Sequence, residues 1–334
     1  MNKRKVIIDT DPGIDDALAI IAALKHPDLE VLGLTSVAGN KGIQFTTDNA
    51  ARVLTYFDSG VKVYRGATND YLSLKAGAGE RADEAGFVHG ATGLGSVDLP
   101  INSDVYADQN AIDFILETIQ ANPGEVDIIA LGPLTNLALC VEKDLETMKQ
   151  VRSIHSMGGG VHRGNRSPVA EFNYWFDPTA VDLVFTELGP HVPIWMIGLD
   201  VTHQGIIDMN DLTFMKMAGG ELGAMLYEMM QFYVNTYWHQ NGYMGAVIHD
   251  LMAVIGYIYP DMYSEIYHAN LRCVSDSELA KGQCIVDLHD QFKWEKNAYV
   301  PMKADIAFYK EQTMAILFGE EAAEDYKKRV KSLG

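Results

Sequence analysis

The sequence predicts an α/β protein with a mostly parallel central sheet covered by helices on both faces. Apolar runs such as residues 6–8 and 126–131 are continuous rather than alternating and rich in β-branched side chains, as in strands buried on both sides. Segments with helical periodicity separate these runs, which is typical of a parallel sheet built from β-α-β units. The predicted strands are residues 6–8, 29–37, 61–64, 126–131, 151–157 and 192–197, and the predicted helices begin near residues 15, 42, 108 and 134.

The remaining segments are less regular. Residues 66–104 are rich in glycine and are expected to form a loop region over the strand ends, whereas residues 202–260 are expected to be helical, with Met- and Tyr-rich faces. The chain contains no internal repeat and no linker, so residues 1–334 are expected to form a single domain. The region after about residue 260 contains no recognisable motif.

Composition restricts the possible partners and the compartment. The 334 residues are 48% hydrophobic and 21% charged, and the net charge of −19 argues against binding to nucleic acid or to an anionic membrane surface. A neutral small molecule is not repelled. Three cysteines without CxxC spacing indicate a reducing compartment, and no apolar run approaches the roughly 20 residues that span a bilayer. The basic start of the chain lacks the apolar core of a signal peptide, so the expected location is the cytoplasm.

Four carboxylates follow the first predicted strand: Asp9, Asp11, Asp15 and Asp16. Pro12-Gly13 places a turn between them, and helical periodicity begins at Asp15, so the acids occupy a strand-turn-helix corner. Ligands bind at such strand ends in open α/β sheets. Oxygen donors without a nearby Cys or His favour a hard cation, Ca²⁺ or Mg²⁺. In the alternative interpretation, Asp15 or Asp16 simply caps the helix, but a cap needs only one acid.

Polar groups also follow other predicted strands. Asn40 is either a turn residue or a ligand-binding residue, and the carbonyl of Leu131, before Gly132-Pro133, is a potential cation ligand. Asn165, Glu171 and Asn173 share one loop and could bind several sugar hydroxyls, although a solvated loop has the same composition. His249-Asp250 opens an apolar helix, where each residue alone is better explained as an interior histidine and a helix cap. The remaining histidines, His89 excepted, are interpreted as structural.

Residues 9–17, Asp-Thr-Asp-Pro-Gly-Ile-Asp-Asp-Ala, closely resemble the N-terminal signature of the inosine–uridine-preferring nucleoside hydrolases. The later motifs match that family in order and local spacing over about residues 6–255. The resemblance implies an open, Rossmann-like nucleoside hydrolase fold. It also implies calcium-dependent hydrolysis of the N-glycosidic bond of ribonucleosides, giving ribose and free base. The family reaction is direct attack of a metal-bound water through an oxocarbenium-like transition state. Family members are usually homodimers or homotetramers.

The resemblance also assigns individual residues. The calcium ligands correspond to Asp11, Asp16, Asp250 and the carbonyl of Leu131, and Asp11 is also similar to the general base. The residues that bind ribose or position water correspond to Asp15, Asn40, Met157, Asn165, Glu171 and Asn173. On the base side, His89 resembles a pocket histidine and His249 aligns with a histidine assigned to protonation of the leaving group.

Two departures from the family pattern leave the base preference open. Leu251 follows His249-Asp250 where the family commonly has proline, and residues 237–245 do not reproduce the tyrosine and glutamine placement of pyrimidine-preferring members. Residues that could border the base are Tyr233, Tyr237, Asn241 and Tyr243. Two rival functions are a non-catalytic nucleoside or ribose binder on the same scaffold and a haloacid dehalogenase-type phosphatase. The phosphatase motif requires Thr or Val at the position of Gly13.

Overall fold

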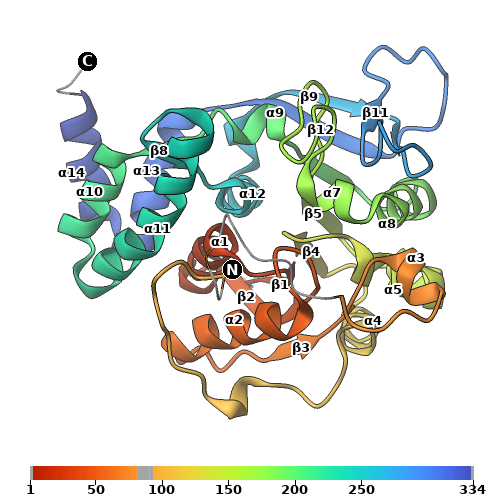
Figure 1. Cartoon of the computed structure of the whole chain (residues 1–334), viewed down its shortest axis with the longest axis horizontal. Helices are drawn as coiled ribbons and strands as arrows, with labels where there is room; N and C mark the ends of the chain where they lie inside the picture. Colours follow the sequence, from red (N-terminus) through yellow and green to blue (C-terminus); the bar gives the residue numbers. More distant parts are fainter. Residues whose placement is uncertain (1–2, 82–89, 91–92, 332–334) are drawn as a thin grey trace.

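The computed structural model describes residues 3–81, 90 and 93–331. Its main feature is an eight-stranded sheet with the order β3-β2-β1-β4-β5-β6-β12-β9, in which only the β12–β9 pair is antiparallel (Figure 1). Its strands are β1 (Arg4–Thr10), β2 (Leu29–Ser36), β3 (Val63–Arg65), β4 (Val126–Ala130), β5 (Ser153–Met157), β6 (Ile194–Ile197), β9 (Tyr263–Ala269) and β12 (Ala298–Ala304). The predicted α/β fold with a mostly parallel sheet is confirmed.

Helices cover both faces of this sheet. The longer ones are α1 (Ile14–Lys25), α2 (Ile43–Tyr56), α4 (Ala111–Ala121), α5 (Thr135–Lys143), α10 (Met209–Ala218), α11 (Gly220–Asn241), α12 (His249–Ile258), α13 (Ile306–Phe318) and α14 (Glu320–Lys331). The shorter ones are α3 (Tyr71–Lys75), α6 (Leu145–Met148), α7 (Phe172–Phe176), α8 (Pro178–Leu183) and α9 (Leu199–Thr202). Within the described part of the chain, no helix combines the length and apolar character needed to cross a membrane.

Strand β1 shows how the sequence builds the two cores. Val6 and Ile8 pack into the core that contains α1, α2 and α12, whereas Ile7 points to the opposite face and packs with α4, α5 and α8. All three side chains are fully buried. Because successive strand residues point to opposite faces, a continuous apolar run is what a strand covered on both sides requires.

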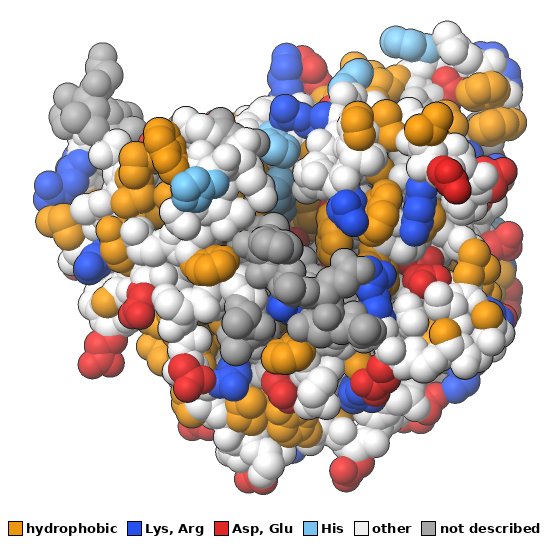
Figure 2. Space-filling model, in the orientation of Figure 1, with side chains coloured by type: hydrophobic (Ala, Val, Ile, Leu, Met, Phe, Trp, Pro, Cys, Tyr) orange, Lys and Arg blue, Asp and Glu red, His pale blue; other side chains and the backbone are white. Residues whose placement is uncertain are grey.

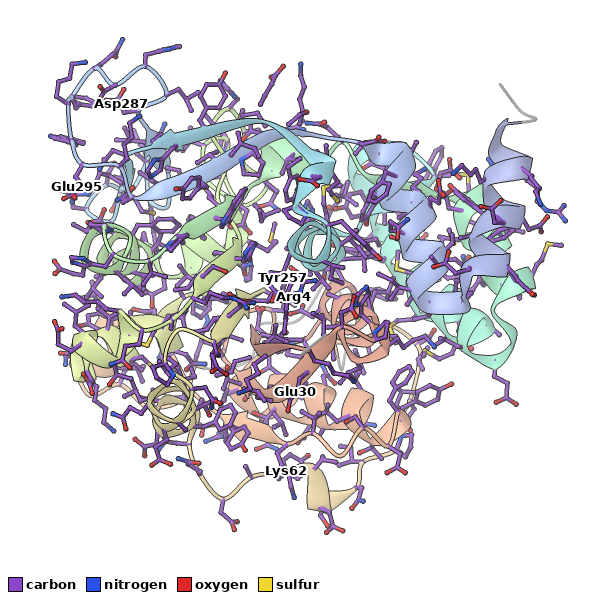
Figure 3. All side chains as sticks on the ribbon, turned by 180° about the vertical axis from the view of Figure 1, so that it is seen from behind. Arg4, Glu30, Lys62, Tyr257, Asp287 and Glu295 are labelled. Carbon is purple, nitrogen blue, oxygen red and sulfur yellow. The ribbon has the colours of Figure 1, made fainter. Side chains whose placement is uncertain are left out.

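The C-terminal end of α12 contacts the first residue of β1. The guanidinium of Arg4 lies 4.6 Å from the ring centroid of Tyr257 and donates a hydrogen bond to the Tyr257 carbonyl at 3.0 Å (Figure 3). Helix α12 also packs along α1. These contacts set the direction of α12, so its first turn, with His249 and Asp250, lies near the first turn of α1.

The sequence-based predictions were wrong in detail at two places. Within residues 202–260, α10 and α11 are flanked by a short antiparallel pair, β7 (Ile206–Asp208) and β8 (Gly245–Val247). The expected loop region 66–104 contains α3. No element was predicted after about residue 260, where the chain contributes β9 and β12 to the central sheet and forms a second small pair, β10 (Leu271–Cys273) with β11 (Cys284–Val286). Strands of three residues are too short to show a periodicity.

Candidate active site

The candidate site lies where the strand order reverses direction. From β1 the chain adds β2 and β3 on one side and β4, β5 and β6 on the other, so β1 and β4 are neighbours although they are far apart in sequence. Open α/β sheets bind ligands outside the carboxyl ends of the strands at such a switch point. Asp11 follows β1 and Leu131 follows β4, and the Leu131 N–H donates to the Asp9 carbonyl at 2.7 Å.

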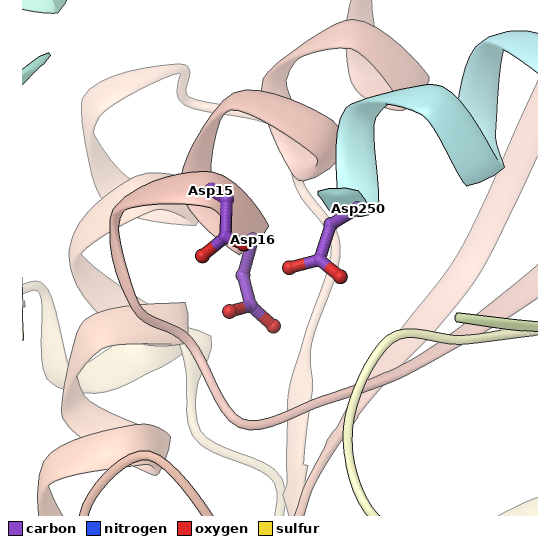
Figure 4. A group of neighbouring side chains, drawn as sticks. All are labelled: Asp15, Asp16 and Asp250. Atoms are coloured by element: carbon purple, nitrogen blue, oxygen red, sulfur yellow. The ribbon is translucent and has the colours of Figure 1, made fainter. Parts of the chain in front are cut away.

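Three carboxylates from two helices meet at this point. Asp15 and Asp16 belong to the first turn of α1 and Asp250 belongs to the first turn of α12, and each offers an oxygen within 4.8 Å of the other two (Figure 4). All three side chains are buried. Carboxylates held this close in a buried site repel one another, so a cation or protons are needed to balance their charge.

The carboxylate of Asp16 is fixed by two hydrogen bonds. The Thr10 hydroxyl donates to Oδ1 at 2.5 Å and the Gly13 N–H donates to Oδ2 at 2.9 Å, which forms the capping box of α1. The N-cap of α1 is Gly13, so the alternative interpretation of Asp15 or Asp16 as the N-cap is wrong. Asp16 instead closes the capping box from the third helical position, and the same carboxylate belongs to the acid group.

Asp11 occupies a tight cradle beside Asp16. Its Oδ2 accepts a hydrogen bond from the Asn40 N–H at 2.6 Å, while the buried Oδ1 has no hydrogen-bond partner among the described residues. A Cβ atom at Gly132 would lie 2.6 Å from Oδ1, and one at Gly39 would collide with Oδ2. Glycine is thus required at both positions, because any side chain there would displace the carboxylate.

Burial and mutual repulsion make these acids hard to ionise. The pKa of Asp11 lies well above its usual value because of burial first and the charge of Asp16 second. The pKa of Asp250 is raised well above its usual value by burial and then by the charges of Asp15, Asp16 and Asp11. Burial also raises the pKa of Asp15 to about 6. A divalent cation would lower all three pKa values by stabilising the ionised forms.

The donor set fits a hard cation. Every candidate ligand is an oxygen, from the four carboxylates and the carbonyl of Leu131, and Asp11 Oδ1 is a buried acceptor that receives no proton from the described protein. Hard cations such as Ca²⁺ take six to eight oxygen ligands of these kinds. Asp15, rather than Asp11, belongs to the group that lies within 4.8 Å, so Asp15 is a further candidate ligand beside the predicted set.

A wall of hydrogen-bonding groups extends outwards from Leu131. Asn173 donates its side-chain amide to the carbonyls of Leu131 and Met157 at 2.7 and 3.2 Å. Glu171 caps α7 by accepting hydrogen bonds from the backbone N–H groups of Asn173 and Tyr174 at 2.8 and 3.1 Å. It also accepts one from the N–H of Gly159 at 2.9 Å. Of the loop residues predicted to bind sugar hydroxyls, Glu171 and Asn173 are thus buried against the ends of β4 and β5, whereas Asn165 is exposed.

Burial has a clear electrostatic effect on Glu171. Burial raises the pKa of Glu171 to about 7, although the three donated N–H groups act in the opposite direction. The charge of Asp15 raises it further. Asn165 is more exposed, and its side-chain oxygen accepts from the Phe172 N–H at 2.9 Å, which holds the loop against α7.

The opposite side of the site contains histidine and tyrosine. The two ring nitrogens of His249 lie 2.8 Å from the Thr202 hydroxyl and 3.2 Å from the Tyr237 hydroxyl. Tyr233 donates to Asp15 Oδ2 at 3.4 Å and its ring meets that of Tyr237 edge-on. His89 lies outside the described residues, as does the side chain of Asn241, so the interpretation of these two positions stays a prediction.

These groups surround a cavity of about 490 Å³. That volume lies within the roughly 300–1,000 Å³ of typical small-molecule sites. Predicted residues that line the cavity are Asp15, Asn40, Leu131, Met157, Asn165, Glu171, Asn173, Tyr233, Tyr237, His249 and Asp250. Asp11 and Asp16 are fully buried behind this lining.

The family model of the inosine-uridine preferring nucleoside hydrolases matches residues 6–311. The chain belongs to this family. As a nucleoside hydrolase it is an enzyme, and the predicted activity class, the hydrolysis of ribonucleosides to ribose and base, is confirmed. The dehalogenase-type phosphatase interpretation is wrong, because the match covers the strand-Asp-x-Asp segment on which it relied.

Similar proteins span most of the chain of this nucleoside hydrolase. Uridine nucleosidase 1 of Arabidopsis thaliana is 36% identical over 287 residues, covering 85% of this chain and 82% of its own. The pyrimidine-specific ribonucleoside hydrolase RihB of Shigella sonnei (strain Ss046) is 35% identical over 273 residues, covering 80% and 84%. The solved structure of a plant nucleoside hydrolase, the PpNRh1 enzyme, superposes with a TM-score of 0.87 at 32% identity, covering 94% and 99%.

Sequence reasoning missed several residues of the nucleoside hydrolase cavity, namely Arg163, Gly164, Arg166, Phe172, His203 and Gln240. His203 was interpreted as structural, yet its ring lies 5.2 Å from that of His249. Its position shortly after β6 is the available signal, because polar residues also follow β1 and β2 at this site. The arginines gave no such signal, because exposed loop arginines are common.

Proposed function

We propose that the cavity hydrolyses pyrimidine ribonucleosides with the help of one calcium ion. The observation that supports this most is the convergence of buried carboxylates and the Leu131 carbonyl beside a hydrogen-bonding wall that suits a sugar. Asp11, Asp16, Asp250 and Leu131 O would hold the ion, and Asp15 lies close enough to contribute. A bound calcium ion supplies a fixed positive charge that lowers the pKa of water and helps to orient it.

Asp11 is the group to which we assign the role of proton acceptor. Calcium activates water less than zinc does, so a base is needed as well. Asp11 Oδ1 is available for this role because no described residue donates to it, and the Asn40 N–H on Oδ2 keeps the carboxylate oriented. Asn40 also donates its side-chain amide to Asp16 Oδ2 at 3.4 Å, so it links the two acids.

Departure of the base leaves positive charge on the sugar. Breaking the bond between the anomeric carbon and the base nitrogen gives an oxocarbenium-like transition state, which negative groups fixed around the sugar stabilise. Asp15 and Glu171 line the cavity and can supply this negative charge. The ribose would be held next to these two carboxylates by Asn165, Met157 and Asn173. His249, which lies between Thr202 and Tyr237, would donate a proton to the departing base.

The preference for pyrimidines is supported by the relatives. The two similar proteins named above are a uridine nucleosidase and a pyrimidine-specific hydrolase, at 36% and 35% identity. Uridine is therefore the first substrate to test. Tyr233 and Tyr237 line the cavity, and Tyr243 packs against Tyr237 with ring centroids 5.6 Å apart.

The decisive experiment measures ribose release from uridine, cytidine, inosine and adenosine, with and without EDTA and added Ca²⁺. We expect release to be fastest with uridine and to stop in EDTA. Asp11→Ala serves as the inactive control. Binding of uridine without release of ribose would favour the non-catalytic binder, and equal rates in EDTA would remove the metal from the proposal.

We also propose that residues 1–334 form one domain that assembles into a homodimer or homotetramer in the cytoplasm. Insertion of β12 beside β6 ties the C-terminal region to the same sheet, which supports one domain. The three cysteines are free, as expected in a reducing compartment. Phe292 and Trp294 stack 4.4 Å apart on the surface, and exposed aromatic pairs favour association. Sedimentation analysis and cell fractionation test these statements.

A further inference from the structure

Two arginines of the loop after β5 line the cavity, Arg163 and Arg166, and both are exposed. The guanidinium of Arg166 lies 4.0 Å from the ring centroid of Trp175, so its position is fixed by stacking. Arg163 forms no hydrogen bond or ion pair with any residue that the structure describes. An arginine at a cavity that forms no ion pair with a described carboxylate can interact with a negatively charged group of a ligand.

Arg163 belongs to the histidine and tyrosine side of the cavity. Burial first, and then the positive charge of Arg163, lowers the pKa of His203. Burial raises the pKa of Tyr243, and the charge of Arg163 acts in the opposite direction, so Arg163 lies near both residues. His203 packs against His249, and Tyr243 packs against Tyr237. In Figure 2, histidine and basic side chains lie around the hollow between the α11 side and the α7 side of this face.

The histidine on this side cannot supply positive charge near neutral pH. Burial first, and then the charge of Arg163, lowers the pKa of His203 to about 4, so its ring is neutral. Arginine keeps its charge at any physiological pH, because its pKa is above about 12. Arg163 therefore places a permanent positive charge in the lining of the cavity, close to His203 and Tyr243.

We infer that Arg163 is a further catalytic residue, whose guanidinium stabilises the negative charge that the base acquires as it leaves. This inference rests on the proposed function. When the bond between the anomeric carbon and the base nitrogen breaks, both electrons stay on the nitrogen and the sugar becomes cationic. Water adds to the sugar and gives its proton to Asp11, and the base anion later takes a proton from solvent or from His249. Arg163 transfers no proton in this scheme, and its contribution is electrostatic.

The test compares uridine with 5-fluorouridine, which has nearly the same shape but releases a more stable base anion. In Arg163→Gln, kcat/KM for uridine should fall roughly 10- to 100-fold, less than the 10²–10³ of an enclosed donor, because the side chain is exposed. The loss should be clearly smaller for 5-fluorouridine, since its anion needs less stabilisation. Arg163→Lys should recover part of the uridine rate. Arg329→Gln, on α14 and outside the lining of the cavity, should leave the ratio between the two substrates at its wild-type value.

If Arg163 had a purely structural role, Arg163→Gln would lower kcat/KM equally for both substrates, and that result would overturn the inference. Wild-type rates in Arg163→Gln would overturn it as well. Neither result affects the proposed function, which fails if the wild-type enzyme releases no ribose. Because Arg163 is exposed and unpaired, the variants are expected to fold, which a circular dichroism melt verifies.

Discussion

Asn173 donates its side-chain amide to the main-chain carbonyl of Leu131 at 2.7 Å. One side chain thus connects the loop that is proposed to bind the sugar with the strand end that would hold a cation. The same amide also reaches the Met157 carbonyl at 3.2 Å. It therefore fixes the ends of β4 and β5 relative to each other. Three expected functions, binding of the cation, binding of the sugar and alignment of two strands, meet in this residue.

Replacing this residue should damage both catalysis and stability. Asn173→Ala leaves a buried carbonyl without its donor, which costs about 1–3 kcal/mol, and we expect kcat/KM to fall roughly 10- to 100-fold. The matched control is Asn110→Ala, which removes the cap of α4 far from the cavity. That variant should lose about 1 kcal/mol of stability and keep its kcat/KM. Steady-state kinetics and thermal melts distinguish the two variants. A kcat/KM of Asn173→Ala equal to that of Asn110→Ala would contradict the role of Asn173.

Calcium should stabilise the folded protein through the acid group. After treatment with EDTA, added CaCl₂ should raise Tm, since a ligand at about 100 times its Kd stabilises by roughly 2.7 kcal/mol. Asp250→Asn should abolish most of this rise, because Asp250 is part of the acid group. Asp305→Asn, at the cap of α13, should retain it. A rise of the same size in Asp250→Asn would place the ion elsewhere.

Gly132 should tolerate no side chain. A Cβ there would lie 2.6 Å from Asp11 Oδ1 and 2.9 Å from Val37 Cγ1, so Gly132→Ala must displace the carboxylate or the strand end. We expect at least a roughly 100-fold loss of kcat, in line with removal of a catalytic base. Gly79→Ala is the control, because a Cβ at Gly79 meets nothing within 4 Å. Calorimetry checks that Gly132→Ala is folded, and near-normal turnover by it would contradict the assignment of Asp11.

Glu171 should make the metal-free protein less stable as pH rises. Burial raises its pKa from 4.5 to about 7, so between these values the folded protein keeps a proton that the unfolded chain has released. The contribution of Glu171 to stability is therefore complete below pH 4.5 and is lost as pH rises through 7. The shift corresponds to roughly 3 kcal/mol. Urea unfolding between pH 5 and 8 should show a smaller pH slope in Glu171→Gln than in the wild type. Identical slopes would contradict a raised pKa.

Local patterns predicted the corner from Asp9 to Asp16 because strand, turn and helix follow one another within a few residues. The approach of Asp250 to that corner depends on the packing of α12 against α1, which no local pattern encodes, so only the family resemblance suggested it. His203 and Arg163 were missed for a related reason. The direction in which a loop side chain points is set by its neighbours in space, and periodicity carries no information about it.

Strand β12 has a consequence for the making of the protein. It lies between β6 and the edge strand β9, and within the described residues β9 pairs with β12 alone. A polypeptide that ends before Ala298 thus lacks one strand and leaves another without any neighbour. During synthesis, the sheet stays incomplete until Ala298–Ala304 has left the ribosome, and a nascent chain exposes an open edge at β6 until then.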